Sequence, residues 1–428
     1  MFKKAVGTLL LALSLFAVSA EAKTFTYSQV HKMPKSVEKD YYIWRFLRQR
    51  STTAAQARSI IHEANSLNKK MKEAYRHKTG SYPNFHPTPV RYKVNDADKW
   101  KNRSQGHFAF KKGIAMVQRN ELIRAAEYFN AAYRIYEDRW EKDKALFWLY
   151  LVTKDGEYLT QLKHSYHINM YTLLAADLTK SKYPSTIVVP KVSKNSVWGI
   201  DSHDPIAWAK MKRKIYSGNI DLDDLADTCR SKETIGMHSY IKARACNYHK
   251  SYFPMPYRDL MKHYSVERQA LIYAIARQES RFVPAAVSRS FALGLMQFMP
   301  FLIDHVAKQK GERIDYDDIF NPYKAIEYAD YHLDYLNKYL YHPLFIAYAY
   351  NGGIGFTKRL IRKKGNFRPG RFEPYLSMEK MKNAEAREYG KKVLTNYIVY
   401  MNLLGKPIRL LPFLKTLTDP SMTDRFRK

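Results

Sequence analysis

The sequence predicts an all-α protein in two parts, an α-superhelix of helical hairpins followed by a compact helical domain. Apolar residues recur every three or four positions over most of the chain, which is the period of helices with one buried face. The chain, at 428 residues, is also longer than one hydrophobic core usually supports. A proline-punctuated joint at 252–257 separates the two parts, and we place the boundary between residues 254 and 255.

Residues 1–22 have the pattern of a secretory signal peptide. Lys3 and Lys4 precede an apolar run from Ala5 to Val18, and Ala20–Ala22 is a small-residue cleavage site. The run is short for a membrane span, and no cysteine near the cut would accept a lipid. The alternative is an uncleaved anchor. We expect an exported protein with no membrane anchor after cleavage.

The charge balance is strongly basic, with 72 Lys and Arg against 40 Asp and Glu. Nucleic acid, an anionic membrane or an anionic cell-wall polymer would each suit such a chain. The basic residues are spread along the sequence, so a generally basic composition that keeps the protein soluble is an equal alternative. Export argues against nucleic acid as a partner.

Cys229 and Cys246 are the only cysteines. In an oxidising compartment this pair predicts one disulfide, worth about 3 kcal/mol by loop entropy, and two free thiols are the alternative. A zinc site needs more ligands, and His62-Glu63 lacks the second histidine of a zinc protease. These residues therefore do not predict a metal site.

The region before residue 254 shows helix after helix. Leu122–Trp140 carries one buried face, Lys144–Val152 is a second helix, and Glu157–Leu178 is a third. Prolines interrupt the pattern at 77–98 and 181–204, which we expect to be extended connections. Asp204-Pro205 then begins a helix, as an N-cap followed by proline at the first helical position.

The later part contains a carboxyl group on an apolar stripe. At 3.6 residues per turn, Ile272, Ile275, Ala276 and Glu279 share one helix face. Such a carboxyl group must be paired, protonated or functional. The alternative to a functional role is a structural ion pair at a helix end.

Further helices follow this stretch. One runs from Pro300 through Lys310, and another opens at Asn321-Pro322 and continues through Tyr339. A last helix, Tyr389–Leu404, ends at Gly405, and the remaining residues are expected to form a tail.

Three short motifs then occur in order: ARQES at Ala276–Ser280, GLMQFMP at Gly294–Pro300 and AYNGG at Ala349–Gly353. Together they resemble the catalytic domain of the soluble lytic murein transglycosylase family. The resemblance covers roughly residues 254–405 and implies a lysozyme-like domain. In the larger members of that family a ring-like α-superhelix precedes this domain, and the hairpins before residue 250 are similar in kind.

The resemblance implies roles for individual residues. Glu279 matches the single catalytic acid and base, and Ser288 matches a serine that orients it and the sugar. Tyr350 matches a tyrosine that hydrogen-bonds near the catalytic carboxyl group, and Glu385 matches a second glutamate that contacts substrate without acting as nucleophile. The other positions implied to contact the glycan are Met296, Gln297, Met299 and Asn351.

The sequence departs from the family pattern at three places. Phe291 stands where the family usually has glycine, Val283 where it has asparagine, and Ala386 where it has threonine. These departures concern the shape of a loop and the sugar subsites, and they leave the catalytic glutamate in place.

The implied reaction is cleavage of the β-1,4 bond after N-acetylmuramic acid, giving 1,6-anhydromuramoyl ends. This reaction requires no metal and no cofactor. An apolar pocket would raise the pKa of the glutamate toward about 6, so that it first donates and then accepts a proton. The implied partner is peptidoglycan in the periplasm, together with unidentified cell-wall machinery, and we expect a monomer. The superhelix would be either a platform for long glycan strands or a purely structural support.

Two alternatives belong to other classes. A lysozyme-type hydrolase would need a second carboxylate to hold a water molecule, and Asp304 or Asp330 could serve. A wall-binding scaffold without catalysis would use the superhelix as its interaction surface.

Overall fold

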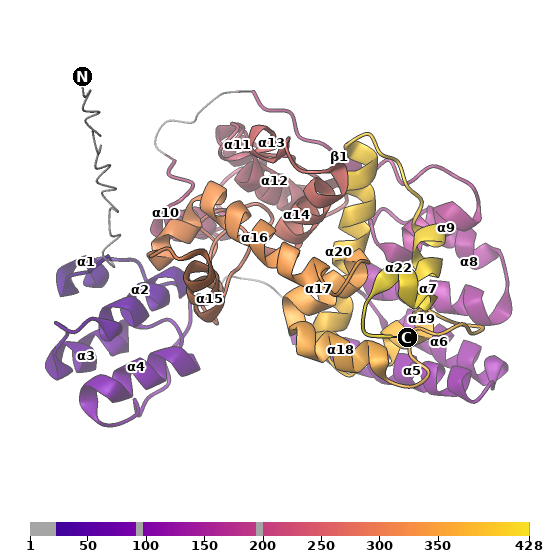
Figure 1. Ribbon diagram of the computed structural model, residues 1–428, viewed down its shortest axis with the longest axis horizontal. Helices are drawn as coiled ribbons and strands as arrows, with labels where there is room; N and C mark the ends of the chain where they lie inside the picture. Colours follow the sequence, from indigo (N-terminus) through magenta and orange to yellow (C-terminus); the bar gives the residue numbers. More distant parts are fainter. Residues whose placement is uncertain (1–22, 91–96, 194–199, 428) are drawn as a thin grey trace, which may run out of the picture.

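The computed structural model describes residues 23–90, 97–193 and 200–427, with the side chains of 97–102 left aside. Within these ranges the regular secondary structure is almost entirely helical, which confirms the predicted class (Figure 1). Two short strands, β1 (Ile187–Val188) and β2 (Ser251–Tyr252), pair in parallel. The expected signal peptide at 1–22 lies outside the described residues.

The first four helices form a group at the left of Figure 1, beside the C-terminal helices. Helix α2 carries most of its core: Tyr41, Ile43 and Leu47 are fully or almost fully buried. Helix α4 ends at Gly80, whose φ of 83° is the left-handed conformation that favours glycine. The bounds are α1 (Tyr27–His31), α2 (Val37–Arg48), α3 (Ala54–Ile60), η1 (Ile61–Glu63) and α4 (Lys69–Thr79).

The next five helices form a stack in which each packs on the following one, at the right of Figure 1. Two helices predicted as single units are each divided in two. The predicted helix Leu122–Trp140 breaks before Asp138, whose side chain caps α7, and the predicted helix Glu157–Leu178 breaks before Asn169, which caps α9. The bounds are α5 (Ala97–Gln118), α6 (Leu122–Ile135), α7 (Arg139–Thr153), α8 (Glu157–Lys163) and α9 (Met170–Leu178).

A third group packs around a small core of its own that includes Trp208 and Cys229. Asp204 caps the first of its helices as predicted. The predicted disulfide is wrong, because Cys229 and Cys246 are both free. They end the two helices of a hairpin, so they lie about 16 Å apart along it, beyond disulfide reach. The bounds are α10 (Pro205–Tyr216), α11 (Leu222–Thr228) and α12 (Ile235–Ala245).

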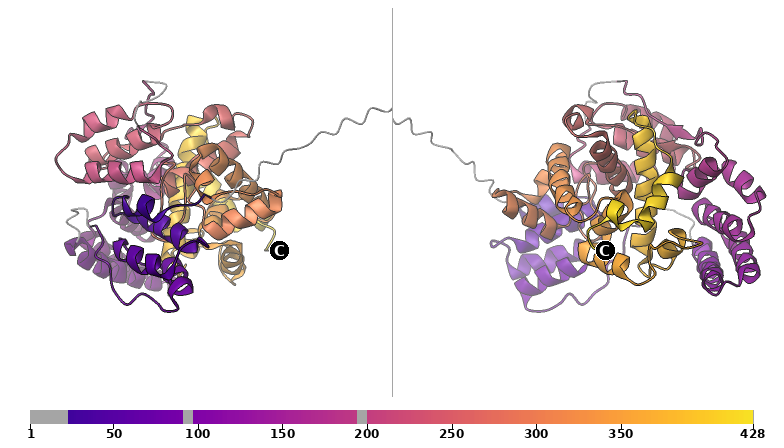
Figure 2. Two further views of the ribbon diagram at one scale, coloured as in Figure 1. Left: turned by 90° about the vertical axis from the view of Figure 1, so that its left-hand side faces the viewer. Right: turned by 45° about the vertical axis from the view of Figure 1, so that its right-hand side comes forward.

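The C-terminal helices occupy the centre, and Figure 2 shows α20 between the first group and the α5–α9 stack. The chain end is not a tail, because Leu410, Leu414 and Leu417 are buried and Arg427 pairs with Asp424 inside the fold. The bounds are α13 (Arg258–Met261), α14 (Val266–Glu279), α15 (Pro300–Lys310), η2 (Tyr316–Phe320), α16 (Pro322–Asn337), α17 (Pro343–Gly352), α18 (Ile354–Arg362), α19 (Tyr375–Glu379), α20 (Ala384–Leu403), α21 (Leu410–Lys415), η3 (Thr416–Thr418) and α22 (Pro420–Thr423).

One continuous apolar core joins the N-terminal helices to the C-terminal ones. Phe291, one of the departures from the family pattern, is part of this junction. Its φ is 61°, in the left-handed region where glycine is easiest to place. Its buried ring lies 5.4 Å from the ring of Trp44 and 6.0 Å from that of Tyr41, both on α2. Phenylalanine at this position therefore costs backbone strain, and its ring in return contacts the first helical group.

Polar contacts reinforce the same junction. Arg45 on α2 binds Asp315 at 2.6 Å and Asp317 at 3.0 Å, and all three side chains are largely buried. Asn68 donates to the carbonyl oxygen of Arg289 at 2.8 Å, beside the turn that contains Phe291. The first helical group is thus fixed to the loop that follows α14.

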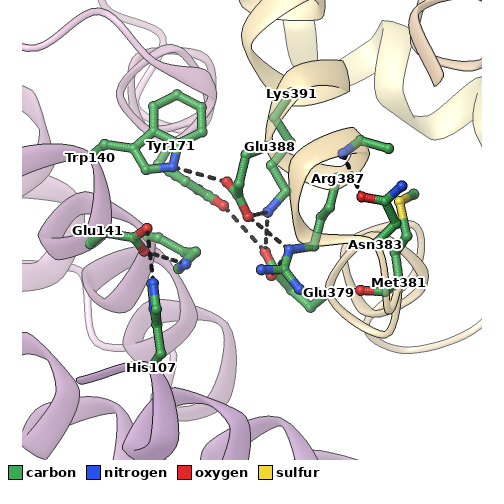
Figure 3. Close-up of polar contacts among 12 residues, drawn as sticks. His107, Trp140, Glu141, Tyr171, Glu379, Met381, Asn383, Arg387, Glu388 and Lys391 are labelled. Carbon is green, nitrogen blue, oxygen red and sulfur yellow. Dashed lines mark hydrogen bonds and ion pairs between the residues drawn. The ribbon is translucent and has the colours of Figure 1, made fainter. Parts of the chain in front are cut away.

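The α5–α9 stack meets α19 and α20 through a buried network of charges (Figure 3). Lys391 on α20 lies 2.6 Å from Glu379 and 3.3 Å from Glu388. From the other side, the indole of Trp140 donates to Glu388 at 3.0 Å and the hydroxyl of Tyr171 donates to Glu379 at 3.2 Å. Removing one partner from such a pair typically costs 3–5 kcal/mol, so these contacts hold α20 firmly against the stack.

We expect Phe291→Ala to lower the free energy of unfolding by about 3 kcal/mol, because it removes a buried ring while keeping the strained backbone. Urea unfolding followed by circular dichroism measures the change. Phe301, which is 67% exposed, provides the control: Phe301→Ala should change stability by under about 0.5 kcal/mol. Equal effects of the two substitutions would contradict the assigned role of Phe291.

Candidate functional site

Glu279 is the last residue of α14, on a helix whose preceding residues Ala270 to Ala276 are buried. The helix starts at Ser265, whose side chain accepts a hydrogen bond from the backbone of Arg268. It ends at Ser280, which leaves the helical conformation. A carboxyl group at this end faces the negative pole of the helix, which disfavours its ionised form.

The surroundings raise the pKa of Glu279 from an ordinary 4.5 to about 7. Burial is the main cause, because it penalises the charged form. The hydroxyl of Tyr389 donates to Oε1 of Glu279 at 2.7 Å and opposes the shift, whereas the charge of Glu385 adds to it. A carboxyl group with this pKa can hold or release a proton near neutral pH, as a general acid and base must.

The GLMQFMP segment folds into a tight loop beside the end of α14. Gly294 has a φ of 75°, and a Cβ atom there would lie 2.4 Å from the carbonyl oxygen of Ile319, so only glycine fits. Leu293 and Phe298 exchange backbone hydrogen bonds across the loop. The hydroxyl of Ser280 donates to the carbonyl oxygen of Leu295 at 2.7 Å. This bond joins the first motif to the second.

The third motif reaches the same loop from α17. The hydroxyl of Tyr350 donates to the carbonyl oxygen of Met296 at 3.0 Å. The ring of Tyr350 lies 6.3 Å from that of Phe298 and 5.6 Å from that of His332. Burial lowers the pKa of His332 to about 4, so its ring is neutral near neutral pH. The three motifs thus meet beside Glu279, where the rings of Tyr350, Phe298 and His332 pack together.

Tyr350 hydrogen-bonds beside Glu279, to the carbonyl oxygen of Met296, and it is Tyr389 that donates to the Glu279 carboxyl group itself. The expected contact of Met296 with a glycan needs correction. The side chain of Met296 is fully buried, so it packs in the core and does not offer a surface to a ligand. Met296 instead contributes its backbone carbonyl oxygen, which accepts the hydrogen bond from Tyr350.

Helix α20 supplies two further contacts to the site. Gly390 allows its close approach to α17, since a Cβ atom there would lie 2.2 Å from the ring of Tyr348. The neighbouring Tyr389 is buried and reaches Glu279. One turn earlier, the exposed Glu385 accepts a hydrogen bond from Asn351 at 3.5 Å. Sequence reasoning missed Tyr389 because nothing in its spacing sets it apart from the other tyrosines.

The remaining predicted residues are held by backbone contacts. Gln297, with a φ of 52°, donates from Nε2 to the carbonyl oxygens of Ala286 and Gly294. Ser288 accepts a hydrogen bond from the backbone N–H of Ala292, which shapes the turn that contains Phe291. Met299 is half-buried at the N-cap of α15. Contact of these side chains with a glycan remains a prediction.

The two carboxylates considered for a hydrolase are engaged elsewhere. Asp330 lies 2.8 Å from the guanidinium of Arg268. Asp304 accepts a hydrogen bond from the hydroxyl of Tyr316 at 2.8 Å. Glu385 is the carboxylate whose charge acts on Glu279.

Nowhere in residues 23–90, 97–193 and 200–427 do three or more His, Cys, Asp or Glu side chains gather in a way that could hold a metal ion. None of the helices in these ranges is both long enough and apolar enough to cross a membrane.

Comparison with known proteins identifies the region around the three motifs. Residues 257–371 match the family described as the Transglycosylase SLT domain. The chain is homologous to the soluble lytic murein transglycosylase of Escherichia coli K12, with 26% identity over 228 residues, 50% of this chain and 34% of that one. The membrane-bound lytic murein transglycosylase C of Pectobacterium atrosepticum is 35% identical over 161 residues, 33% of this chain and 44% of that one.

Among solved structures, the 70 kDa soluble lytic transglycosylase of Escherichia coli is similar with a TM-score of 0.47 and 17% identity, over 93% of this chain and 64% of that one. The chain spans about a third of the length of the Escherichia coli relative. The matched family range ends before α19 and α20, so the assignment of Glu385 and Tyr389 to the site depends on the contacts described above.

Glu279 should make stability depend on pH in a defined direction. Its pKa is higher in the folded than in the unfolded protein, so between about pH 4.5 and 7 the folded state binds more protons and stability falls as pH rises. We expect Glu279→Gln to remove this loss and to be more stable than the native protein at pH 8, by up to about 3 kcal/mol.

Urea unfolding of both proteins at pH 4.5 and pH 8 measures this difference, which should be small at the lower pH. The exposed Glu385 serves as control, and Glu385→Gln should change stability little at either pH. If the difference in free energy of unfolding between Glu279→Gln and the native protein were the same at both pH values, the raised pKa would be contradicted.

Proposed function

We propose that this protein is a lytic transglycosylase that cleaves the β-1,4 bond between N-acetylmuramic acid and N-acetylglucosamine in peptidoglycan. Glu279 donates its proton to the glycosidic oxygen and then, as a base, takes the proton of the C6 hydroxyl group of the same muramic acid. That hydroxyl group attacks C1, so the product ends in a 1,6-anhydro ring and no water is consumed. The acetamido group of the sugar stabilises the positive charge that develops at C1.

The observation that carries the proposal is the state of Glu279. Its pKa of about 7 lets one carboxyl group serve both steps near neutral pH. The hydrogen bond from Tyr389 fixes the Oε1 atom, so that Oε2 is the oxygen available to the substrate. The match of residues 257–371 to the Transglycosylase SLT domain supports the same reaction class.

A lysozyme-type hydrolase is the second candidate. It would use a carboxylate to activate water, and an inverting enzyme needs about 6.5–9.5 Å between the two carboxyl groups. Asp330 and Asp304 are bound to Arg268 and Tyr316, which disfavours both as this second carboxylate. A scaffold without catalysis is disfavoured because burying an unpaired carboxyl group costs stability that a structural protein has no reason to bear.

The N-terminal helices act, in this proposal, as structural support for the catalytic helices. They share one core with them, and α20, which carries Tyr389, is held by the charge network at the α5–α9 stack. A role as a platform for long glycan strands is compatible with this support. We place the protein in the periplasm as a monomer, on the pattern of the signal peptide at 1–22 and on its proposed substrate.

Substituting Glu279 by glutamine should abolish release of anhydro-muropeptides from purified sacculi, because the amide cannot donate or accept the proton. We expect a loss of about 10²- to 10⁴-fold, measured by mass spectrometry of the released fragments. Glu385→Gln, which keeps Glu279, should retain the anhydro product at a reduced rate. Reducing ends in place of anhydro ends from the native protein would establish the hydrolase instead.

Replacing Tyr389 by phenylalanine should raise the pKa of Glu279 further, because the lost hydrogen bond stabilises the carboxylate. We expect the alkaline limb of the pH–rate profile to move up by about one pH unit. Tyr350→Phe is the matched control, because its hydroxyl group binds the Met296 carbonyl and should leave that limb in place. Equal pH profiles for the two variants would contradict the assigned role of Tyr389.

A further inference from the structure

A cavity of about 260 Å³ lies where the α5–α9 stack, α12, β2, α14 and α20 meet. Glu279 is not among its lining residues. Arg277, which does line it, is two positions from Glu279, and two residues apart on a helix are about 200° apart around the axis. The cavity therefore lies on the opposite side of α14 from the catalytic carboxyl group.

The cavity is lined by cations and carries no acidic side chain. Arg277 is partly buried in its wall, while Arg281, Lys250 and Lys392 are exposed around it. Within the described ranges none of these four cations lies within 4.0 Å of a carboxylate. The aromatic side chains of the wall are Trp140, His167, Tyr240, Tyr248, Tyr252 and Phe282.

Arg277 is held so that its charge stays in place. Its Nε donates to the carbonyl oxygen of Tyr252 at 2.8 Å and its Nη1 donates to Oδ1 of Asn396 at 2.7 Å. The guanidinium carbon lies 3.8 Å from the centre of the Phe253 ring. Within the described residues Nη2 donates to no partner. Both N–H groups of Nη2 and the second N–H group of Nη1 are thus left for a ligand on a fixed guanidinium.

Other buried cations in this protein are neutralised. The buried lysines and arginines of the described ranges each contact a carboxylate, for example Arg45 with Asp315 and Lys391 with Glu379. Burial without such a partner lowers the pKa of Arg277 to about 10, which still leaves it charged at neutral pH. A sheltered charge with no counter-ion is unfavourable, and a bound anion would offset that cost.

We propose that this cavity binds the carboxylate group of a short peptide, with Arg277 as the bidentate partner and Arg281 and Lys392 as further cations. A guanidinium edge matches the two oxygens of a carboxylate. The volume equals that of about nine water molecules, enough for a carboxylate and the few carbon atoms next to it. The tyrosine and tryptophan walls suit the apolar part of such a terminus.

On the proposed function, on which this identification of the ligand rests, the peptide is the stem peptide of peptidoglycan. The cavity would then hold a peptide of the wall while Glu279 acts on a glycan on the other side of α14. The basic wall gives the site a means of selecting acidic peptides over uncharged ones. Binding there should weaken as salt screens the cations that line the cavity.

The test uses the full chain and a matched pair of probes, N-acetyl-D-alanyl-D-alanine and its C-terminal amide, which differ in the charge of one group. Saturation-transfer NMR at low salt measures both dissociation constants. We expect the acid to bind at least tenfold more tightly than the amide. Equal binding of acid and amide, or no binding of the acid, would overturn the proposal.

Variants locate the site. Arg277→Gln should abolish binding of the acid, and because Arg277 also holds Asn396, the exposed pair Arg281→Gln with Lys392→Gln provides a second variant that should weaken binding at least fivefold. Unchanged binding in that double variant would overturn the proposal. Inorganic phosphate is the third probe: binding of phosphate without the peptide would overturn the peptide assignment.

The inference and the proposed function can fail separately. Glu279→Gln should leave binding of the acid unchanged, because the catalytic carboxyl group lies across α14 from the cavity. A native protein that releases anhydro-muropeptides but does not bind the peptide would reject the cavity assignment and keep the proposed function. A native protein that binds the peptide but releases no anhydro ends would reject the proposed function and keep a peptide-binding cavity.

Discussion

A carboxyl group that keeps its proton near neutral pH is the constraint from which the arrangement of the C-terminal helices follows. Glu279 needs a buried position, a helix end that disfavours its negative charge, and one fixed hydrogen-bond donor. Burial alone would leave its two oxygens without orientation. The hydroxyl group of Tyr389 supplies the orientation, and its hydrogen bond lowers the pKa of Glu279. The site is thus a balance in which burial and the helix end act against one hydrogen bond.

The three sequence motifs act through the backbone as much as through their side chains. Ser280 and Tyr350 both bind carbonyl oxygens of the GLMQFMP loop, at Leu295 and Met296. Gly294 makes the loop possible by admitting the carbonyl oxygen of Ile319 where a Cβ atom would stand. A motif of this kind is visible in a sequence because the loop restricts several positions at once, even where those positions touch no substrate.

Three features could be predicted because each depends on local spacing. They are the all-α class, the helix starts at Asp204 and Pro300, and the place of Glu279 on an apolar stripe. Tyr389 could not, since its role depends on how α20 packs on α14, and the chain has 34 tyrosines. The disulfide failed for a related reason: the separation of Cys229 and Cys246 along the chain says nothing of the hairpin that places them at opposite ends. The folded chain end did carry a signal, leucines at 410, 414 and 417.

The charge network between α20 and the α5–α9 stack connects the N-terminal helices to a site that they do not enter. On α20, Glu388 and Lys391 are one turn apart and face the stack (Figure 3). The adjacent Tyr389 donates to Glu279. A rotation of α20 by one residue, about 100°, would move the tyrosine off the carboxyl group. Apolar side chains can repack after such a shift, but buried charges lose their partners and the shift becomes costly. The network therefore sets the rotation of α20, and through it the position of Tyr389, which donates to Glu279.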